Sequence, residues 1–299
     1  MGARGITPTR NTVFTMFIII GYVIIIGCVV GGYAMQGGHL GVLWQPIELL
    51  VIGGASAGAF VVATPKKHLG ATFKALPKAF KGVSLSKEHY MNLLALLFDI
   101  LGKVRKEGLM SVEADVEAPD ASPLFQKYPD VLKDHHLVEF ITDYLRLMVS
   151  GNLNPMEIEN LMDNEMETHH HEALVPSHAI TMVSDGLPAM GIVAAVLGVV
   201  HTMGLVGQPP AVLGHAIGAA LVGTFMGILM SYGFVGPIAS VMAAYVDEEG
   251  KQYQCVKVTL LASLNGYAPQ IAVEFGRKVL YSTERPTFSE LEGHVKGKK

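Results

Sequence analysis

Charged side chains are missing from long parts of this sequence. Lys and Arg are absent from residues 11–65 and again from residues 147–250, and residues 187–246 also contain no Asp or Glu. Only 16% of the 299 residues are charged, whereas soluble domains carry about 25%. These absences exclude an ordinary soluble domain and predict an integral membrane protein.

Cysteine is equally scarce. The two cysteines, Cys28 and Cys255, lie far apart in the chain and give no disulfide framework. The first apolar run is too long for a secretory signal and has no convincing cleavage site of small residues. We therefore expect this run to remain as a membrane span.

Four apolar stretches are long enough to cross a bilayer as helices, which takes about 20 residues. Two predicted hairpins contain them: residues 13–63, with spans at 13–35 and 47–63, and residues 183–246, with spans at 187–206 and 211–241. The span at 47–63 is short but within the range for a thin or protein-lined span.

The distribution of basic residues predicts the orientation. The loops at 36–45 and 207–210 contain no Lys or Arg, whereas the leader 1–12, the segment 64–182 and the tail 247–299 contain all of them. Basic segments stay in the cytoplasm. The predicted fold is an all-α membrane protein with four transmembrane helices, a large cytoplasmic helical domain between the second and third, and both termini in the cytoplasm.

Small residues recur at helical spacing inside three of the spans. Such residues let helices approach closely in lipid. We expect contact faces at Gly54 and Gly58 in the second span, and at these positions in the third and fourth: Gly191, Ala194, Ala195, Gly198, Gly214, Gly218, Gly223 and Gly227.

The segment between the hairpins is predicted to be helical. Residues 89–105 and 134–149 carry leucines and aromatic residues at the spacing of amphipathic helices. Pro155 then begins an acidic helix over 156–173. In the tail, residues 251–264 could continue the last span as helix beyond the membrane.

Several histidines invite a metal or proton role. His169, His170 and His171 are consecutive, so on a helix they point about 100° apart and at most two could share one ion. A solvated acidic helix is the simpler interpretation. His201 and His215 lie in apolar runs, where either a proton path or an interfacial hydrogen bond explains them.

Two prolines and a threonine stand out in the second hairpin. Pro188 and Pro237 lie near the cytoplasmic ends of its spans, as packing features or as hinges beside an ion route. Asp185 is a candidate helix-entry cap or exit-side carboxylate. Thr224 is the hydroxyl deep in the last span, and back-bonding to its own helix is the simplest role for it.

The clearest absence is that of a carboxylate at mid-membrane. An ion-driven protein needs a titratable or coordinating group at that depth, and none of the four spans clearly supplies one. If this chain uses an ion gradient, a partner must contribute the acid.

Three segments carry a resemblance to a known family: LPAMGIVAAVLGVVHTMG (187–204), LVGTFMGILMSYGFVGPIA (221–239) and NGYAPQIAVEFGRKVLYSTERPTF (265–288). They resemble the MotA family of flagellar motor stator subunits, within the wider MotA/TolQ/ExbB group of proton channels. Residues 31–49, 74–80 and 143–169 resemble it too, so the resemblance covers nearly all of the chain from about Met16. Residues 265–288 are typical of MotA rather than of TolQ or ExbB.

The resemblance implies a stator of five copies around a pair of MotB-type chains, whose aspartate accepts the proton. It places the family's functional prolines at Pro188 and Pro237 and its channel threonine at Thr224. Sodium-driven relatives carry a hydroxyl residue where this chain has Ala195, and a methyl group cannot coordinate Na⁺, so H⁺ is the expected transported ion. The bacterial inner (plasma) membrane is the implied location.

The resemblance also implies a rotor contact. The family's charged pair that touches the rotor protein FliG falls on Arg105 and Glu113, which would otherwise be interpreted as surface charge. We expect a motor and channel subunit rather than an enzyme, with no cofactor, no metal and no nucleic-acid partner. Two alternatives are a TolQ/ExbB-like energiser of an envelope complex and a membrane metalloenzyme. The histidines of the metalloenzyme would lie at opposite membrane depths.

Overall fold

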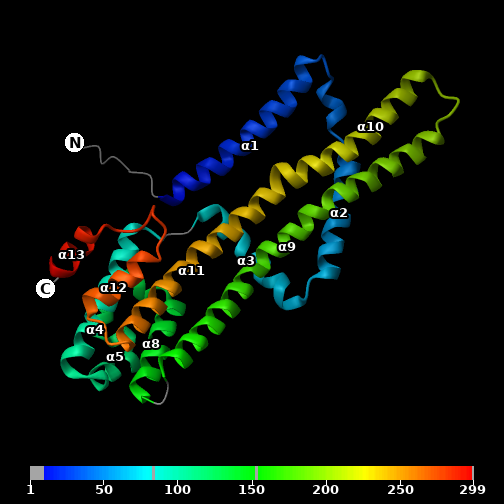
Figure 1. The fold of residues 1–299 in the computed structure, drawn as a ribbon. Helices are drawn as coiled ribbons and strands as arrows, with labels where there is room; N and C mark the ends of the chain where they lie inside the picture. The colour runs from blue at the N-terminus through cyan, green and yellow to red at the C-terminus, as the bar shows by residue number, and fades with distance from the viewer. Residues whose placement is uncertain (1–9, 83–84, 152–153, 298–299) are drawn as a thin grey trace, which may run out of the picture. The chain divides into compact units, whose positions relative to one another are not determined.

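The computed structural model describes the backbone of residues 10–82, 85–151 and 154–297, and side chains from residue 15 onward. The described residues form helices and no strands (Figure 1). The longer α-helices are α1 (Arg10–Met35), α2 (Pro46–Ala63), α3 (Lys66–Lys81), α4 (Lys87–Glu107), α8 (His135–Ser150), α9 (Pro155–Met203), α10 (Pro210–Ile228), α11 (Gly236–Leu264), α12 (Pro269–Lys278) and α13 (Phe288–Gly297). Shorter elements are η1 (Leu40–Leu43), η2 (Leu109–Val112), α5 (Glu113–Glu117), η3 (Pro119–Ala121), α6 (Pro123–Gln126), α7 (Pro129–Leu132) and the π-helix η4 (Leu229–Val235).

Four helical segments are long and apolar enough to cross a membrane: Thr15–Met35, Leu40–Ala63, Pro155–Met203 and Pro210–Leu264. A long helical region lies between the second and third of them in the sequence. The predicted fold class, an all-α protein with four membrane helices and a large helical insert, is confirmed.

Two of these helices continue far past their apolar parts. The acidic helix predicted at 156–173 and the third apolar run belong to one unbroken helix, α9, which contains Pro176 and Pro188 (Figure 1). Similarly, α11 extends to Leu264, as the sequence suggested. Asp185 lies inside α9 and is exposed, so it does not cap a helix entry.

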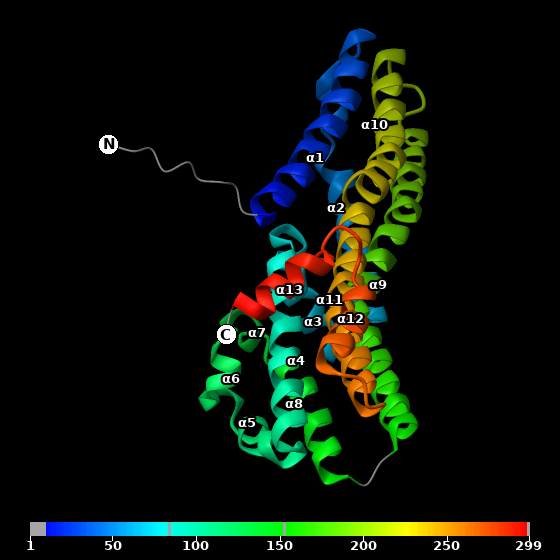
Figure 2. The same cartoon turned by 60° about the vertical axis from the view of Figure 1, so that its left-hand side comes forward.

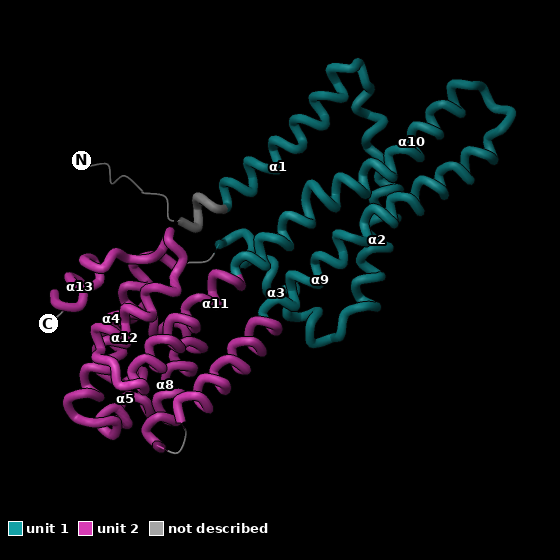
Figure 3. Tube along the Cα trace, in the orientation of Figure 1, with its two compact units in different colours: residues 1–83, 173–245 teal, residues 84–172, 246–299 magenta. Residues whose placement is uncertain are grey.

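The chain divides into two compact units, which interleave in sequence (Figure 3). Unit 1 comprises residues 1–83 and 173–245, and unit 2 comprises residues 84–172 and 246–299. This division differs from the domain boundaries expected from the sequence. Residues 66–81 and 173–182 of the expected insert belong to unit 1, and the tail belongs with residues 84–172 in unit 2.

The contacts of α3 explain its place in unit 1. The Thr15 hydroxyl of α1 donates a hydrogen bond to the Phe80 carbonyl oxygen, and Phe60 of α2 makes an edge contact with Phe73 at 6.2 Å between ring centroids. Amphipathic α3 thus contacts both helices of the first hairpin.

Unit 2 is organised around α4. Figure 2 shows α4 between α6 and α7 on one side and α12 on the other, and all three contact it. The leucine pairs Leu93–Leu94 and Leu96–Leu97 are completely buried, which is possible because helices cover α4 on several faces. Tyr144 of α8 is also fully buried in this unit.

Candidate functional site

The third and fourth apolar helices meet through residues that have almost no side chain. A Cβ atom added at Gly191 of α9 would stand 3.0 Å from the Gly223 carbonyl oxygen and 3.1 Å from the Gly227 Cα atom. At Gly198, an added Cβ would stand 2.7 Å from the Ala220 Cβ atom. The close contact expected from the small residues is therefore confirmed between α9 and α10, within unit 1.

Other small residues do not take part in this contact. Nothing in the described chain lies within 4 Å of a Cβ added at Gly54, Gly58 or Gly214, and Gly218 meets only a Val42 methyl at 3.8 Å. The glycine spacing also indicated Gly214 and Gly218 of α10 as contact positions. The structure limits the contact with α9 to the later part of α10, because η1, rather than α9, lies beside Gly218.

Ala195 and Thr224 lie together in the α9–α10 contact. A Cβ at Gly223 would be 3.3 Å from the Ala195 backbone nitrogen, and a Cβ at Gly191 would be 3.4 Å from the Thr224 Cα atom. Both side chains are half-buried. The structure thus places these two predicted site residues on facing helices with only glycine and alanine between them.

The Thr224 hydroxyl differs from those of Thr202 and Ser240. Thr202 donates to the Gly198 carbonyl oxygen at 2.8 Å, and Ser240 donates to the Gly236 carbonyl oxygen at 3.2 Å, so both are back-bonded to their own helices. Thr224 makes no such bond and has no hydrogen-bond partner among the described residues. The back-bonded role expected from the sequence is therefore not observed, and a half-buried hydroxyl is left available in the uncharged part of the α9–α10 contact.

Pro188 lies at the same contact. The carbonyl oxygen of the preceding residue, Leu187, would be only 2.6 Å from a Cβ at Gly227. Pro188 itself is half-buried, and α9 continues unbroken through it. Leu187, Ala195 and Thr224 therefore belong to one surface of contact, and Pro188 directly follows Leu187 in the chain.

Pro237 lies in different surroundings from Pro188. It is exposed and lines an apolar cavity of about 180 Å³ together with Tyr22 and Ile25 of α1 and Ala79 of α3. It lies more than three helical turns beyond Thr224 along the fourth span. The structure does not bring the two prolines to one point.

The helix before Pro237 changes its hydrogen-bond register. Pro237 has no N–H group, and its ring conflicts with the carbonyl group four residues earlier. Residues 229–235 form a π-helix, in which the Gly236 N–H donates to the Ser231 carbonyl oxygen, five residues back. Short π segments within α-helices are frequent at functional sites.

Ser184 and Ser231 support this π-helix, and the sequence analysis did not assign them a role. The Ser184 hydroxyl of α9 lies 3.2 Å from the Ser231 carbonyl oxygen, to which it donates, and 3.1 Å from the Ser231 hydroxyl. Both serines are buried, Ser231 completely. A serine four to six residues before each proline was the signal that could have identified them.

The predicted rotor residues lie in unit 2 at the end of α4. Arg105 is in the last turn of α4, Glu113 is the first residue of α5, and Gly108 between them adopts a φ of +87°. Both side chains are exposed. Within the described chain neither makes an ion pair or a side-chain hydrogen bond, so both charges remain available to a partner.

The turn that carries Glu113 is fixed by a neighbouring carboxylate. Asp115 accepts hydrogen bonds from the Lys103 ammonium at 2.7 Å and from the Ser122 hydroxyl at 2.6 Å. Burial alone would raise the pKa of Asp115, but these two hydrogen bonds and the Lys103 charge lower it overall. Asp115 thus holds α5 against α4 as a carboxylate.

The histidines singled out from the sequence do not assemble into one metal site. His169 is half-buried, His171 is exposed and lies 3.6 Å from Glu167, and His201 and His215 are exposed in different helices. Across residues 10–82, 85–151 and 154–297, no group of three or more His, Cys, Asp or Glu is placed to hold a metal ion.

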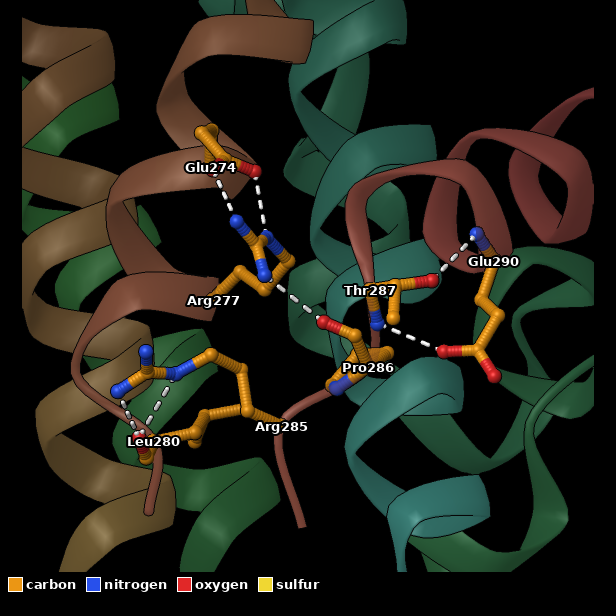
Figure 4. A network of polar contacts seen from close by, with 7 residues as sticks. All are labelled: Glu274, Arg277, Leu280, Arg285, Pro286, Thr287 and Glu290. Carbon is orange, nitrogen blue, oxygen red and sulfur yellow. Dashed lines mark hydrogen bonds and ion pairs between the residues drawn. The ribbon is translucent and has the colours of Figure 1, made fainter. Parts of the chain in front are cut away.

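The segment 265–288, which carried the most specific resemblance, forms a polar network in unit 2 (Figure 4). Arg277 is buried and donates to Glu274 at 2.6 Å and to the Pro286 carbonyl oxygen at 2.8 Å. Hydrogen bonding from Arg277 lowers the pKa of Glu274. Arg285 donates to the Leu280 carbonyl oxygen at 2.7 Å, and the Thr287 N–H donates to Glu290 at 2.7 Å. These bonds fix the loop between α12 and α13.

Comparison with known proteins gives the family. Residues 19–108 match the model for the motility protein A N-terminal region, and residues 133–255 match the MotA/TolQ/ExbB proton channel family. The chain is 54% identical to Motility protein A of Salmonella typhimurium over 94% of this chain and 95% of that protein. It is 53% identical to Motility protein A of Escherichia coli over 95% of this chain and 96% of that protein. The chain belongs to the motility protein A (MotA) family.

Solved structures show the same fold. A chain of "C. jejuni MotAB" superposes with a TM-score of 0.72 at 19% identity, covering 89% of this chain and 96% of that one. A chain of "the flagellar MotAB stator complex from Bacillus subtilis" gives a TM-score of 0.68 at 24% identity, covering 86% of this chain and 92% of that one. The four-span layout with a helical insert is thus the MotA fold.

The MotA family matches cover most of the predicted site residues. Pro188, Ala195, Thr224 and Pro237 fall in the channel-family match, and Arg105 falls in the motility protein A match. The match to the MotA N-terminal region, together with the identities to Motility protein A, agrees with membership of the MotA family.

Proposed function

We propose that this chain is the stator subunit of a flagellar motor that couples proton flow to torque. The observation that carries the proposal is the α9–α10 contact: the uncharged apolar part of α9, from Leu187 onward, packs closely on α10, and the Thr224 hydroxyl there has no partner among the described residues. Such a surface can line a path for an ion but offers no group that exchanges a proton at mid-membrane. A second chain must supply the acid, and the relatives of known structure are MotAB complexes.

In this proposal, five copies surround a pair of MotB-type chains in the bacterial inner membrane, with both termini in the cytoplasm. An aspartate of the MotB-type chain accepts the proton. Thr224 and Ala195 line the path, and Pro188 and Pro237 shape the two helices beside it. The protein acts as a channel and motor subunit and carries out no bond chemistry.

Arg105 and Glu113 would contact the rotor protein FliG. Both are exposed and unpaired in the described chain, on either side of a turn fixed by Asp115. Complementary charges steer docking, and like charges placed opposite each other cost several kcal/mol. Two free charges of opposite sign beside one rigid turn suit such a contact.

Proton conduction with and without the partner tests the channel. We expect cytoplasmic acidification when the chain is expressed with the MotB-type partner, and none when it is expressed alone or with a partner whose acidic residue is replaced by its amide. Acidification by this chain alone would refute the partner requirement.

Thr224→Val tests the path itself, because valine keeps the shape of threonine and removes the hydroxyl. We expect it to reduce proton flow strongly while the complex still assembles. Thr202→Val is the matched control, since its hydroxyl is already bonded to its own helix. Equal effects of the two variants would show that Thr224 has no special role.

The transported ion is tested by swimming in two conditions. We expect motility to vanish with a protonophore at constant sodium and to be independent of external sodium, because Ala195 offers no oxygen ligand. Swimming speed that rises with sodium would overturn the assignment of H⁺.

A further inference from the structure

Unit 2 contains a polar cavity that the proposed function does not use. It has a volume of about 230 Å³ and is lined by side chains of α8, α9 and α11. Arg105, Glu113 and the α9–α10 contact are not part of it. Its lining combines aromatic rings with carboxylates and contains no Lys or Arg.

Four rings form the walls of this cavity. The His136 and His169 rings lie 6.3 Å apart between centroids, and the Tyr253 ring lies 4.9 Å from that of His169. Phe140 meets Tyr253 edge to face at 5.3 Å. The rings come from three helices, so the cavity is walled on several sides.

Three carboxylates add negative charge to the lining. Asp143 accepts a hydrogen bond from Arg146 at 2.6 Å, and Glu165 accepts one from Tyr144 at 2.7 Å. Glu139 is exposed, and its carboxylate has no partner among the described residues. The lining therefore has more negative charge than its neighbours neutralise.

Tyr253 is the buried polar side chain of this lining. Its side chain belongs to a residue that is only 7% exposed, and it lines the cavity. Its hydroxyl has no hydrogen-bond partner in the described chain. A ligand in the cavity can therefore form a hydrogen bond with this hydroxyl without displacing a protein partner.

The arrangement of the lining indicates the class of ligand. A transition metal needs three or four donor atoms converging on one point, and the described residues contain no such group. Separate carboxylates among aromatic faces suit an organic ammonium ion, which binds rings by cation–π contact and donates several hydrogen bonds. We propose that this cavity binds an aliphatic diamine or polyamine, with one ammonium group at Glu139 and Tyr253.

Titration calorimetry of the purified full-length chain with its MotB-type partner tests this, with putrescine as the probe. We expect saturable binding of putrescine and none of butane-1,4-diol, which has the same length and no charge. Equal binding of the diol, or no binding of putrescine, would overturn the proposal. Binding of Zn²⁺ that is lost on replacing His136 and His169 by alanine, without putrescine binding, would instead indicate a metal site.

Three variants locate the site. Glu139→Gln should weaken putrescine binding about tenfold, which is about 1.4 kcal/mol. Tyr253→Phe should also weaken it while the ligand-free chain keeps its melting temperature, because the hydroxyl has no partner to lose. Glu167→Gln, an exposed carboxylate of α9 outside the cavity, is the matched control and should bind as the unaltered chain does. Equal weakening by Glu167→Gln and Glu139→Gln would show general charge attraction and refute the site.

Discussion

In unit 1 the contact of α9 with α10 depends on glycine residues, which have no side chain. In unit 2 the contacts of α4 depend on large side chains and on polar bonds. Gly191 and Gly227 bring two backbones together where apolar burial gives no drive to associate. In unit 2, each buried leucine of α4 contributes about 1.5–3 kcal/mol. In unit 1, therefore, the added volume of a larger side chain limits which substitutions are tolerated. In unit 2, the limit is the cost of leaving a polar group without its partner.

Unit 2 also contains a chain of polar bonds that has no equivalent in the α9–α10 contact. His89 of α4 lies 3.1 Å from the Gln252 amide oxygen of α11, and the Gln252 amide nitrogen donates to Asp134 at 2.8 Å. His89 also lies 3.5 Å from Asp130. Burial alone would raise the pKa of Asp130, but hydrogen bonds from His89 and Asn92 lower it overall. These bonds give α4 and α11 one defined register.

The largest expected effect on stability is at Arg277 in unit 2. Breaking a buried ion pair by removing one partner costs about 3–5 kcal/mol. We expect Arg277→Leu to fall near the lower end, because Glu274 remains partly exposed. The surface pair of Arg146 with Glu117 is the control, and Arg146→Leu should cost only about 0–1 kcal/mol. Thermal unfolding of the detergent-solubilised chain measures both, and equal losses would remove the distinction between buried and surface pairs.

Gly227→Ala should have the next largest effect, in unit 1. Its Cβ would stand 2.6 Å from the Leu187 carbonyl oxygen, so the two helices must separate. Overpacking of this kind costs about 1–3 kcal/mol. Gly214→Ala, which meets nothing within 4 Å, should be neutral or slightly stabilising. Recovery of the intact complex after mild heating would show the difference, and equal recovery would mean that the close contact is not required.

Acid should weaken unit 2 through Asp115. Its folded-state pKa is lowered, so its stabilising effect is present above its unfolded value, about 3.9, and is lost as pH falls through the folded value. We expect Asp115→Asn to unfold at a lower temperature than the unaltered chain at pH 7, with the difference shrinking toward pH 3. The exposed Asp120→Asn is the control. A difference that does not change with pH would exclude a role for the Asp115 charge.

Charge reversal at Arg105 or Glu113 should change stability least. Both residues are exposed, and exposed charges contribute about 0–1 kcal/mol. Under the proposed function, Arg105→Glu and Glu113→Lys still assemble and conduct protons, but they recruit poorly to the motor and give weak torque. Swimming in soft agar measures this, and opposite reversals on the rotor protein should restore part of it. Normal swimming of both variants would make the two residues ordinary surface charge.

The spans and the closest helix contact were predictable from the sequence because they depend on local composition. Apolar runs without charge and small residues at Gly191 and Gly223 are visible without coordinates. The unbroken course of α9 through Pro188 was not, because neighbouring helices can satisfy the backbone that a proline leaves unpaired. Likewise, the assignment of α3 to unit 1 depends on which neighbour its apolar side meets, as its contact with Phe60 shows.

The candidate site was predictable in its parts and not in its geometry. The sequence singled out Thr224, but only the structure shows that its hydroxyl lacks the back-bond that Thr202 makes. Ser184 and Ser231 were missed because serine in a membrane helix usually bonds its own helix. Their pairing depends on a change of helical register that no periodicity reveals.

The π-helix at residues 229–235 has a consequence for insertions and deletions. A π segment holds one residue more than the α-helical turns it replaces. Removing one residue there, for example Gly233, would convert it to α-helix and leave the flanking faces in phase. Removing one residue elsewhere in α10 would turn every following side chain by about 100°. The fourth span can therefore lose a residue at this place. Such a deletion would break the hydrogen bond from Ser184 to Ser231.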